Sequence, residues 1–405
     1  MDSLEGVYWS DQGGGLQRRT FTVVPGDGVG PEVVGAALPV LDAAARAAGA
    51  DLTWQTRDWG ADHYLRTGAA MPADGVDQVR AGDGVLFGAV GRPDVPDHEL
   101  IWGLILKLRQ GLDLAVNVRP ARSLPGLSVL PVLPVPPEPS ELPVAESTGE
   151  RREVDLVVIR ENTEGEYAGV GGRVRRGTPE ELGLEVAVHS ATVIERVSRF
   201  AFETARGRRG RVALVTKSNV MRYGYTLWDE VAGRVAEEYP DVAYEKVLVD
   251  AMATRLVQRP DSLDVLLCGN LFGDVLSDLT AGLVGGLGVT PSANLPIGAG
   301  PGLFEAVHGS APDIAGQGVA NPVATLLSGA MLLDHAGLGE AGSAVRGAVA
   351  AAVADPAHRT RDLGGSASTQ QLADAVLAKL PQVPDRAPRE GLVTSQSAQS
   401  MEVDR

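Results

Sequence analysis

Short apolar runs alternate along the chain with longer segments in which apolar residues recur every three or four positions. The first pattern predicts buried strands, and the second predicts amphipathic helices. The predicted strands are residues 21–24, 52–56, 84–87, 112–118, 154–159, 212–215, 244–249 and 265–268. The predicted helices are residues 33–48, much of 61–80, 99–109, 191–205, 228–238, a segment after residue 270, and residues 324–336, 341–353 and 369–380. This alternation is typical of an α/β fold with helices on both faces of a sheet.

Four segments fit neither pattern over their full length. Residues 1–20 are polar and rich in glycine and form a predicted N-terminal tail, and residues 383–405 form a predicted disordered C-terminal tail. Residues 130–152 are rich in proline, which predicts an exposed insertion or flexible loop without regular structure. A charged, alternating stretch that follows a glycine-rich run and extends to His189 predicts a β arm.

The composition narrows the classes of function. A chain of 405 residues is too long for one small core and predicts two domains. A net charge of −16 argues against non-specific binding to nucleic acid or to an anionic membrane surface. The single cysteine, Cys268, excludes an intrachain disulfide and a cysteine-based zinc site, and its apolar strand predicts a core residue. Because no segment has the apolar pattern of a signal peptide or a membrane span, a cytoplasmic enzyme is expected.

A glycine-rich turn at residues 25–32 joins the first predicted strand to the first predicted helix. The spacing of Gly26, Gly28 and Gly30 differs from the G-x-G-x-x-G fingerprint of dinucleotide-binding folds, and the lysine of a P-loop is absent from the turn. We predict a tight turn that lets the backbone approach a ligand.

Two carboxylates lie one helical turn apart after the strand at 265–268. Asp274 and Asp278 share one face of the predicted helix, and Val275, Leu276 and Leu279 beside them are apolar. Partly desolvated carboxylates need a counter-charge, which Mg²⁺ or Mn²⁺ would supply through oxygen ligands. An exposed acidic face without a metal explains the spacing equally well.

Charged residues end several of the predicted elements. Arg109 ends a helix, and Arg119 and Arg160 each follow a strand. Because a guanidinium matches a carboxylate with two parallel hydrogen bonds, this repeated placement predicts a clamp for substrate carboxylates. Lys217 and Asp250 also follow strands, at the carboxyl ends where ligands bind in open α/β sheets.

Several sequence blocks together resemble the β-decarboxylating dehydrogenases, the family of isocitrate, isopropylmalate, homoisocitrate and tartrate/D-malate dehydrogenases. After Arg109 and Arg119, the blocks are RENTEGEY at 160–167, TKSN at 216–219, VDAMA at 249–253, GNLFGDVLSD at 269–278 and HGSAPDIAG at 308–316. They occur in the family's order between about residue 21 and about residue 380. The resemblance implies that the protein oxidises a 2-hydroxy acid with NAD(P)⁺ and removes its β-carboxylate as CO₂.

The resemblance also implies a two-domain α/β fold of the isocitrate/isopropylmalate dehydrogenase type, with the active-site cleft between the domains. The larger, cofactor-binding domain would combine residues 21–114 with residues 285–382. The smaller domain, residues 115–284, would bind the substrate and carry the dimer interface.

Roles for individual residues follow from the family pattern. The residues that would hold the substrate carboxylates are Arg109, Arg119 and Arg160. The residues that would bind Mg²⁺ or Mn²⁺ are Asp250, Asp274 and Asp278. Lys217 would be the general base for the hydroxyl proton, and Tyr167 would be the acid that protonates the enol carbon. In the family the lysine and the first aspartate come from the partner subunit, so the resemblance implies an obligate homodimer or a larger homo-oligomer.

The family's adenosine-binding loop matches one segment of this chain. Its predicted cofactor-binding residues are His308, Gly309, Ser310, Ala311, Pro312, Asp313, Ile314 and Asn321. A carboxylate at Asp313 can accept hydrogen bonds from the ribose 2′-hydroxyl and repels a 2′-phosphate. Family enzymes that use NADP carry Lys and Tyr where this chain has Asp313 and Ile314, so we predict NAD.

The substituent at C3 distinguishes the substrates of this family. Isocitrate enzymes carry Ser and Asn where this chain has Gly103 and Ile105, which cannot bind the extra carboxylate of isocitrate. Trp102 would fill the space of an isopropyl group, and the run that includes Ile105 and Leu106 resembles the tartrate/D-malate branch, as does the segment that ends at Asn219. A D-malate- or tartrate-like substrate is therefore predicted.

Two alternatives remain open at this point. Ala115 replaces a tyrosine that is common in the tartrate/D-malate branch, so 3-isopropylmalate or a specialised 3-substituted malate is the alternative substrate. The chain could also be a non-catalytic regulatory subunit, but the presence of Tyr167, Lys217 and the three aspartates argues against that interpretation.

Overall fold

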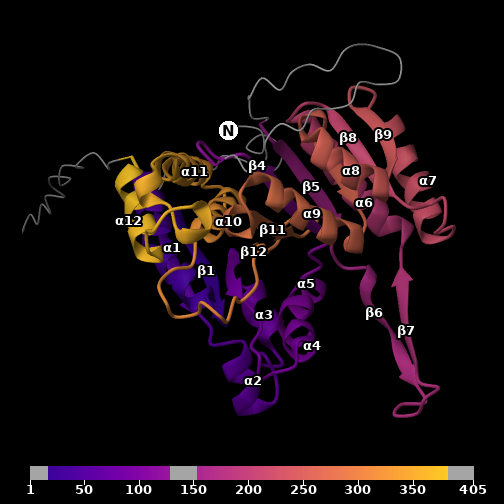
Figure 1. The fold of residues 1–405 in the computed structure, drawn as a ribbon, viewed down its shortest axis with the longest axis horizontal. Coiled ribbons are helices and arrows are strands. Elements are labelled where there is room, and N and C mark those ends of the chain that lie inside the picture. Colours follow the sequence, from indigo (N-terminus) through magenta and orange to yellow (C-terminus); the bar gives the residue numbers. More distant parts are fainter. Residues whose placement is uncertain (1–16, 128–152, 382–405) are drawn as a thin grey trace, which may run out of the picture.

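The computed structural model describes residues 17–127 and 153–381. The predicted proline-rich insertion at 130–152 and the predicted C-terminal tail at 383–405 lie outside the described residues. One ten-stranded sheet runs through the described part of the chain (Figure 1). In sheet order its strands are β2 (Ala50–Thr56), β1 (Gln17–Gly26), β3 (Gly84–Ala89), β12 (Gly302–Ala306), β11 (Pro291–Leu295), β4 (Val116–Arg122), β5 (Asp155–Glu161), β10 (Val265–Cys268), β8 (Arg211–Thr216) and β9 (Ala243–Leu248).

The two ends of the sheet are each parallel, and the middle is antiparallel. Strands β2, β1, β3 and β12 run in one direction, and β5, β10, β8 and β9 run together in the other. Between them β11 and β4 are antiparallel to both of their neighbours. The boundary proposed between the two domains falls between β11 and β4, and this division of the chain stays a prediction.

Helices connect the strands. They are α1 (Gly30–Ala47), α2 (Ala61–Thr67), α3 (Gly75–Arg80), α4 (Asp97–Leu100), a π-helical segment (Ile101–Ile105), α5 (Leu106–Gly111), α6 (Ala191–Arg206), α7 (Gly224–Glu237), α8 (Val249–Gln258), α9 (Asn270–Val284), α10 (Val323–His335), α11 (Gly339–Ala354) and α12 (Thr369–Lys379). Within residues 17–127 and 153–381, no helix has the length and apolar character needed to cross a bilayer.

Alternate side chains of the first strands enter different apolar clusters. Phe21 of β1 and Leu86 of β3 pack in the main core with apolar residues of α1 and α10. Val24 and Val85, which point the other way, pack in a second cluster with residues of α2 to α5. Because side chains alternate across a strand, helices cover both faces of this part of the sheet, which confirms the predicted α/β class.

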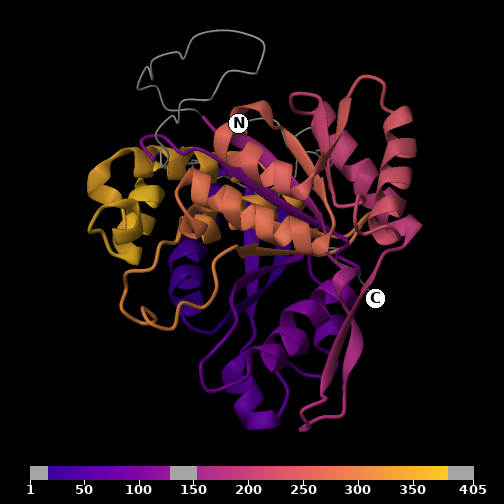
Figure 2. The ribbon, with the colours of Figure 1, turned by 45° about the vertical axis from the view of Figure 1, so that its right-hand side comes forward.

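A two-stranded arm projects from the body of the molecule (Figures 1 and 2). Its strands are β6 (Gly165–Val174) and β7 (Leu182–Val188), which pair antiparallel. The predicted β arm is therefore present. At the base of the arm, α9 packs against β6 and also against β4 and β5 of the sheet, so it joins the arm to the main sheet.

The predicted strand at 112–118 begins later than expected, at Val116. The backbone of Asp113 is left-handed, with φ of 52°, and the Leu114 amide donates to the Arg109 carbonyl at 2.9 Å. These two features end α5 at Gly111 and delay the start of β4 to Val116. Arg119 therefore lies inside β4, and Arg160 likewise lies inside β5, so neither arginine follows the end of its strand as predicted.

Other boundaries also differ from the predictions. Strand β1 begins at Gln17 and includes four residues that were assigned to the N-terminal tail. The helical pattern at 61–80 divides into α2 and α3, because α2 ends at the left-handed Gly68. Asp250 lies in the first turn of α8 and not at the end of β9. Cys268 is wholly buried in β10, as predicted for a core residue.

Strands β11 and β12 were not predicted. The segment before β11 is rich in glycine, and Gly285 and Gly286 both have positive φ. Such residues hide the apolar periodicity of the short strands that follow. Both strands nevertheless occupy the centre of the sheet, where every residue of each is buried.

Candidate active site

A cavity of about 440 Å³ lies at the carboxyl ends of β3 and β12. The π-helical segment and α5 form one wall, and β4, β5, β6 and α9 contribute the opposite one. Its lining residues are Phe87, Gly88, Ala89, Val90, Ile101, Trp102, Ile105, Leu106, Arg109, Arg119, Arg160, Tyr167, Asp274, Glu305, Ala306, Val307, His308 and Gly309. The fold thus brings together the three predicted carboxylate-binding arginines and the three predicted pocket residues of the α4–α5 region.

The wall that carries Trp102 is irregular. A π-helical segment interrupts the helix between α4 and α5, a feature frequently found at functional sites. The Trp102 ring rests against Gly169 of β6, because a Cβ added at Gly169 would lie 2.7 Å from the indole. Gly169 also has a φ of 74°, which favours glycine. The base of the β arm therefore holds the tryptophan at the edge of the cavity.

Arg109 is held by a residue that the sequence analysis did not assign. Its Nη2 donates to the Oε1 atom of Glu305 on β12 at 2.7 Å, and both side chains are almost fully buried. The Nε atom of Arg109 is buried and has no hydrogen-bond partner among the described residues. The Nε atom of Arg119 is in the same condition. Buried donors are normally satisfied, so these two Nε atoms are exceptions among the described residues, and neither is exposed to the cavity.

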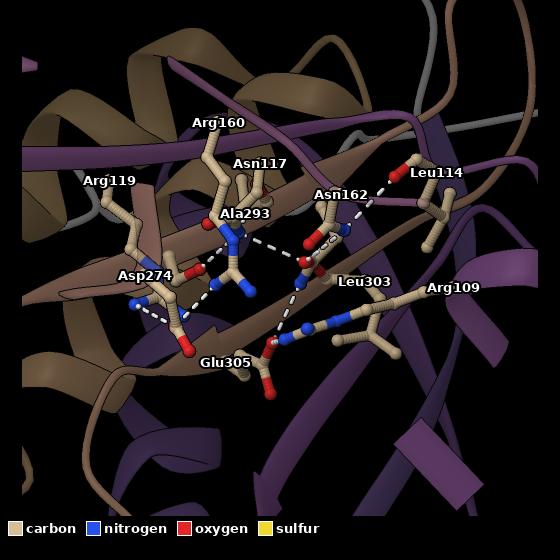
Figure 3. Close-up of polar contacts among 12 residues, drawn as sticks. Arg109, Leu114, Asn117, Arg119, Arg160, Asn162, Asp274, Ala293, Leu303 and Glu305 are labelled. Atoms are coloured by element: carbon tan, nitrogen blue, oxygen red, sulfur yellow. Dashed lines mark hydrogen bonds and ion pairs between the residues drawn. The ribbon is translucent and has the colours of Figure 1, made fainter. Parts of the chain in front are cut away.

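Arg119 and Arg160 converge on one aspartate (Figure 3). Arg160 Nη1 donates to Asp274 Oδ1 at 2.6 Å, and Arg119 Nη1 lies 3.3 Å from the same oxygen. Arg119 also contacts Asp278 at 3.5 Å. Arg160 is fixed further by two hydrogen bonds to Asn270 Oδ1, at 3.0 and 2.7 Å. The site is therefore a cluster of three buried arginines that contact three carboxylates, those of Glu305, Asp274 and Asp278, so an anionic ligand would bind through guanidinium N–H groups and not through an excess of positive charge.

The two predicted metal-binding aspartates have opposite electrostatic environments. Burial alone would raise the pKa of Asp274, but the charges of Arg160 and Arg119 outweigh it, so the pKa lies below its ordinary value. For Asp278, burial dominates and raises the pKa above its ordinary value, with Arg119 offsetting only part of the effect. The positive charge near Asp278 thus does not fully offset the cost of burying its carboxylate.

Tyr167 lies on β6 and points into the same cluster. Its hydroxyl donates to Asp274 Oδ2 at 3.0 Å, and the Arg160 guanidinium lies 5.6 Å from the centre of its ring. Burial, with the negative charge of Asp274, raises the pKa of the phenol. The hydroxyl is therefore protonated at neutral pH and can donate a proton within the cavity.

Three other predicted site residues lie elsewhere. Lys217, directly after β8, donates to Asp250 Oδ1 at 2.8 Å, and this hydrogen bond lowers the pKa of Asp250. Neither residue lines the cavity. Asn219 is exposed in the turn that follows Lys217. The described chain therefore does not bring these residues to the arginine cluster.

The donor set partly fits a divalent cation. Asp274 and Asp278 present carboxylate oxygens on one helix face, the ligand type that Mg²⁺ and Mn²⁺ prefer. However, no group of three or more His, Cys, Asp or Glu residues suited to a metal ion occurs in residues 17–127 and 153–381. One described chain thus offers two of the three predicted ligands in one place.

A second cavity, of about 570 Å³, lies beside the predicted adenosine-binding loop. Its lining residues are Val29, Gly288, His308, Ala311, Asp313, Ile314, Gln317, Val319, Ala320, Asn321, Arg361 and Asp362. His308 lines both cavities, and its buried Nε2 atom has no hydrogen-bond partner among the described residues. Two neighbouring cavities that share His308 as a lining residue suit an elongated ligand such as a dinucleotide.

Not every predicted cofactor-binding residue lines this second cavity. Ser310 and Pro312 do not, and Gly309 lines only the first cavity. Arg361 and Asp362 do line it but were not predicted. Asp362 accepts a hydrogen bond from the Asn321 amide at 2.9 Å, a contact between residues 41 positions apart that no local pattern indicates.

The glycine-rich turn at residues 25–32 packs against the predicted adenosine-binding loop. None of its glycines lines either cavity. The Val29 amide donates to the Ser310 carbonyl at 2.8 Å, and a Cβ at Gly28 would lie 1.9 Å from that same oxygen. The tight approach at Gly28 is therefore to the chain's own loop, and Val29 of the same turn lines the second cavity, so the approach of this backbone to a ligand stays a prediction. Glu32 adds to the support, because its carboxylate accepts hydrogen bonds from the amides of Gly318 at 3.1 Å and Ala320 at 2.9 Å.

Known proteins share both the sequence and the fold. The model of the isocitrate/isopropylmalate dehydrogenase family matches residues 20–376. A probable tartrate dehydrogenase/decarboxylase of Agrobacterium vitis is 45% identical over 364 residues, covering 89% of this chain and 97% of that protein. The D-malate dehydrogenase [decarboxylating] of Escherichia coli is 41% identical over 369 residues, covering 89% of this chain and 98% of that protein.

A solved structure extends the similarity to three dimensions. The isocitrate dehydrogenase of Methylococcus capsulatus is 36% identical and superimposes with a TM-score of 0.78, covering 90% of this chain and all of that one. The family model spans most of the chain, and the three arginines, Tyr167 and Asp274 line one cavity in the fold. The chain therefore belongs to the isocitrate/isopropylmalate dehydrogenase family and is an oxidoreductase of the β-decarboxylating type.

Proposed function

We propose that the protein catalyses the NAD-dependent, divalent-metal-dependent oxidative decarboxylation of a malate-type 2-hydroxy acid, with D-malate or tartrate as the substrate. The observation that carries the proposal is the cluster of three buried arginines in a cavity that Trp102 narrows at its edge. Relatives named as tartrate and D-malate dehydrogenases, at 45% and 41% identity, support the same substrate class.

Substrate binding would depend on the arginines. The guanidinium groups of Arg109 and Arg119, which line the cavity, would donate to substrate carboxylates, and Arg160 would add charge from its fixed position beside Asp274. Because the cluster is buried, each contact would form in a medium less polar than water and would be correspondingly strong.

The protein's own groups would move the protons. Lys217 would take the hydroxyl proton, and Tyr167, which is protonated at neutral pH, would deliver a proton to the carbon that loses CO₂. When bound, NAD⁺ would accept the hydride, and Mg²⁺ or Mn²⁺ held by Asp274 and Asp278 would stabilise negative charge on the substrate oxygen.

We further propose that a second copy of the chain completes each site with its own Lys217 and Asp250. The position of this pair outside the cavity supports such sharing. The β arm supports it too, since it exposes a row of apolar side chains; these are Val170, Val174, Leu182, Leu184, Val186 and Val188. Exposed apolar patches of this kind are typical of protein–protein interfaces.

NAD is the proposed cofactor because Asp313 lies in the second cavity. A carboxylate there would accept hydrogen bonds from a ribose 2′-hydroxyl and would repel a 2′-phosphate. Arg361 lies in the same cavity and could attract a 2′-phosphate. The proposed preference for NAD over NADP therefore requires that Asp313 lie closer to the ribose than Arg361 does.

Replacing Glu32 with glutamine should weaken NAD⁺ binding. The amide nitrogen of Gln would face the backbone N–H of Gly318 or of Ala320, so one hydrogen bond that supports the loop would be lost. A hydrogen bond to a charged group contributes about 1.5–3 kcal/mol, so KM for NAD⁺ should rise roughly tenfold or more. Initial-rate kinetics should show an unchanged KM for the hydroxy acid. The matched control is Asp374→Asn, which alters an exposed carboxylate on α12.

Replacing Trp102 with alanine should widen the range of substrates. The indole lies at the edge of the cavity against Gly169, so its removal frees space beside the predicted position of C3. The ratio of kcat/KM for 3-isopropylmalate to that for D-malate should rise at least about tenfold, the lower end of the effect of one methylene group in an apolar pocket. An unchanged ratio would show that Trp102 does not contact the C3 substituent.

The overall test is NADH formation in the presence of Mg²⁺ or Mn²⁺. D-malate, L-tartrate, meso-tartrate, 3-isopropylmalate and isocitrate are compared, each with NAD⁺ and with NADP⁺. The proposal expects D-malate or a tartrate with NAD⁺ to give the highest kcat/KM. A higher value for 3-isopropylmalate would contradict the interpretation of Trp102, and no turnover of any of the five acids would contradict the proposed substrate class.

A further inference from the structure

A wholly buried asparagine, Asn294, lies on the central strand β11. Its Oδ1 accepts hydrogen bonds from Asn117 Nδ2 at 3.0 Å and from Asn162 Nδ2 at 2.9 Å. Its own Nδ2 donates to the Leu303 carbonyl at 3.0 Å and to Glu305 Oε1 at 2.9 Å (Figure 3). The side chain thus uses its full hydrogen-bonding capacity of two donors and two acceptor positions.

Only one orientation of this amide satisfies its neighbours. A rotation by 180° would place Oδ1 against the carbonyl of Leu303 and the carboxylate of Glu305. It would also place Nδ2 against the amino groups of Asn117 and Asn162, which donate. Because each buried mismatch costs about 1–3 kcal/mol, the amide is locked in the observed orientation.

The three side chains that bond to Asn294 are those of Asn117, Asn162 and Glu305, and each is close in sequence to, or in contact with, one of the three arginines. Asn117 lies two residues before Arg119 on β4. Asn162 lies two residues after Arg160, directly beyond the end of β5.

The third connection runs through a carboxylate. Glu305 Oε1 accepts hydrogen bonds from both Asn294 and Arg109, at 2.9 and 2.7 Å. Arg109 lies on α5, across the cavity from the strands that carry the other two arginines. Asn294 therefore connects the elements that carry the three arginines. Through Glu305 of β12 it is linked to α5, and through Asn117 and Asn162 it is linked to β4 and to the end of β5.

We propose that Asn294 is a positioning residue that sets the relative placement of Arg109, Arg119 and Arg160, and so the fit of the substrate carboxylates. This inference rests on the proposed function, because it assumes that the three arginines bind one hydroxy acid. Small shifts in such a constellation have large effects, since a displacement of about 1 Å can cost about a hundredfold in rate.

The variant Asn294→Asp tests the network with almost no change in size. The oxygen at the Oδ1 position can still accept from Asn117 and Asn162, but the second oxygen cannot donate to the Leu303 carbonyl or to Glu305. The two carboxylates would repel each other, and Glu305 would draw Arg109 out of place. We expect the dissociation constant for D-malate, measured by calorimetry with Mg²⁺ on the full-length protein, to rise at least tenfold. The dissociation constant for NAD⁺ should change less than threefold.

A matched control is Thr290→Val, directly before the same strand. The Thr290 hydroxyl is buried and donates to the Gly286 carbonyl at 3.1 Å, with no link to the arginines. Its loss should leave both dissociation constants unchanged, even if the melting temperature falls. This control separates a loss of positioning from a general loss of stability.

A second variant guards against misfolding of the first. Asn294→Ser adds no charge, and its hydroxyl is too short to reach Glu305, so the same selective loss of D-malate affinity is expected. Unchanged D-malate affinity, or an equal loss for D-malate and NAD⁺, in a folded variant would overturn the proposal. If neither variant folds, Asn294 serves stability, and the proposal is also overturned.

The wild-type protein separates this inference from the proposed function. Wild-type protein that binds D-malate without oxidising it would contradict the proposed function, while the comparison of variants would still report on positioning. Wild-type protein that binds neither D-malate nor L-tartrate would overturn both.

Discussion

Replacing Lys217 with alanine should lower kcat by about three orders of magnitude, because general acid–base catalysis by a positioned side chain contributes about 10²–10⁴. Steady-state kinetics with D-malate and NAD⁺ provide the measurement. The matched control is Lys246→Ala on the neighbouring strand β9, since that lysine also pairs with an aspartate, Asp229, at 2.7 Å. Turnover of Lys217→Ala at the wild-type rate would refute the proposed role of this lysine.

The same variant can test whether two chains share a site. Protein that carries Lys217→Ala would be mixed and reassembled with protein that carries Tyr167→Phe, each inactive alone. In a mixed dimer one site would have both its tyrosine and its lysine intact, because they come from different chains. Random reassembly should therefore restore about a quarter of the wild-type activity. No recovery in dimers shown to have exchanged subunits would contradict the shared site.

Replacing Arg160 with glutamine should weaken both the fold and substrate binding. The guanidinium is fully buried and satisfies Asp274 at 2.6 Å and Asn270 through two hydrogen bonds. Without this guanidinium, Asp274 keeps only the longer contact to Arg119, and Asn270 Oδ1 loses both of its donors from Arg160, so the free energy of unfolding should fall by about 3 kcal/mol, the lower end of the cost of breaking a buried pair. Urea denaturation measures this loss, and calorimetry should show a dissociation constant for D-malate at least a hundredfold higher.

A surface arginine provides the comparison. Arg206→Gln removes exposed ion pairs with Asp241 and Glu203, which contribute little to stability, so both measured quantities should stay at their wild-type values. Lower stability of Arg160→Gln with unchanged affinity for D-malate would show that this arginine supports the fold without binding substrate.

Much of the fold followed from local patterns. Eight of the ten strands of the main sheet were indicated by short runs of apolar and β-branched residues, even though the edge strands β2 and β9 are mostly exposed or half-buried. The shared helix face of Asp274 and Asp278 followed from their spacing, since the period of an α-helix is the same in every fold. Their contact with Arg119 did not follow from it, because that arginine lies 155 positions from Asp274.

The sequence by itself determined the α/β class, the family, and which residue types could carry the chemistry, because these depend on local periodicity and contiguous motifs. Only the tertiary structure decided how those residues meet. It placed Glu305 on Arg109, 196 positions away, and it placed Asn294 between the strand of Glu305 and the strand of Arg119, because sheet order brings together β12, β11 and β4. It also kept Lys217 with Asp250 and away from the cavity. Contacts between such distant segments arise from how strands pair and helices cross, and no short stretch of sequence encodes them.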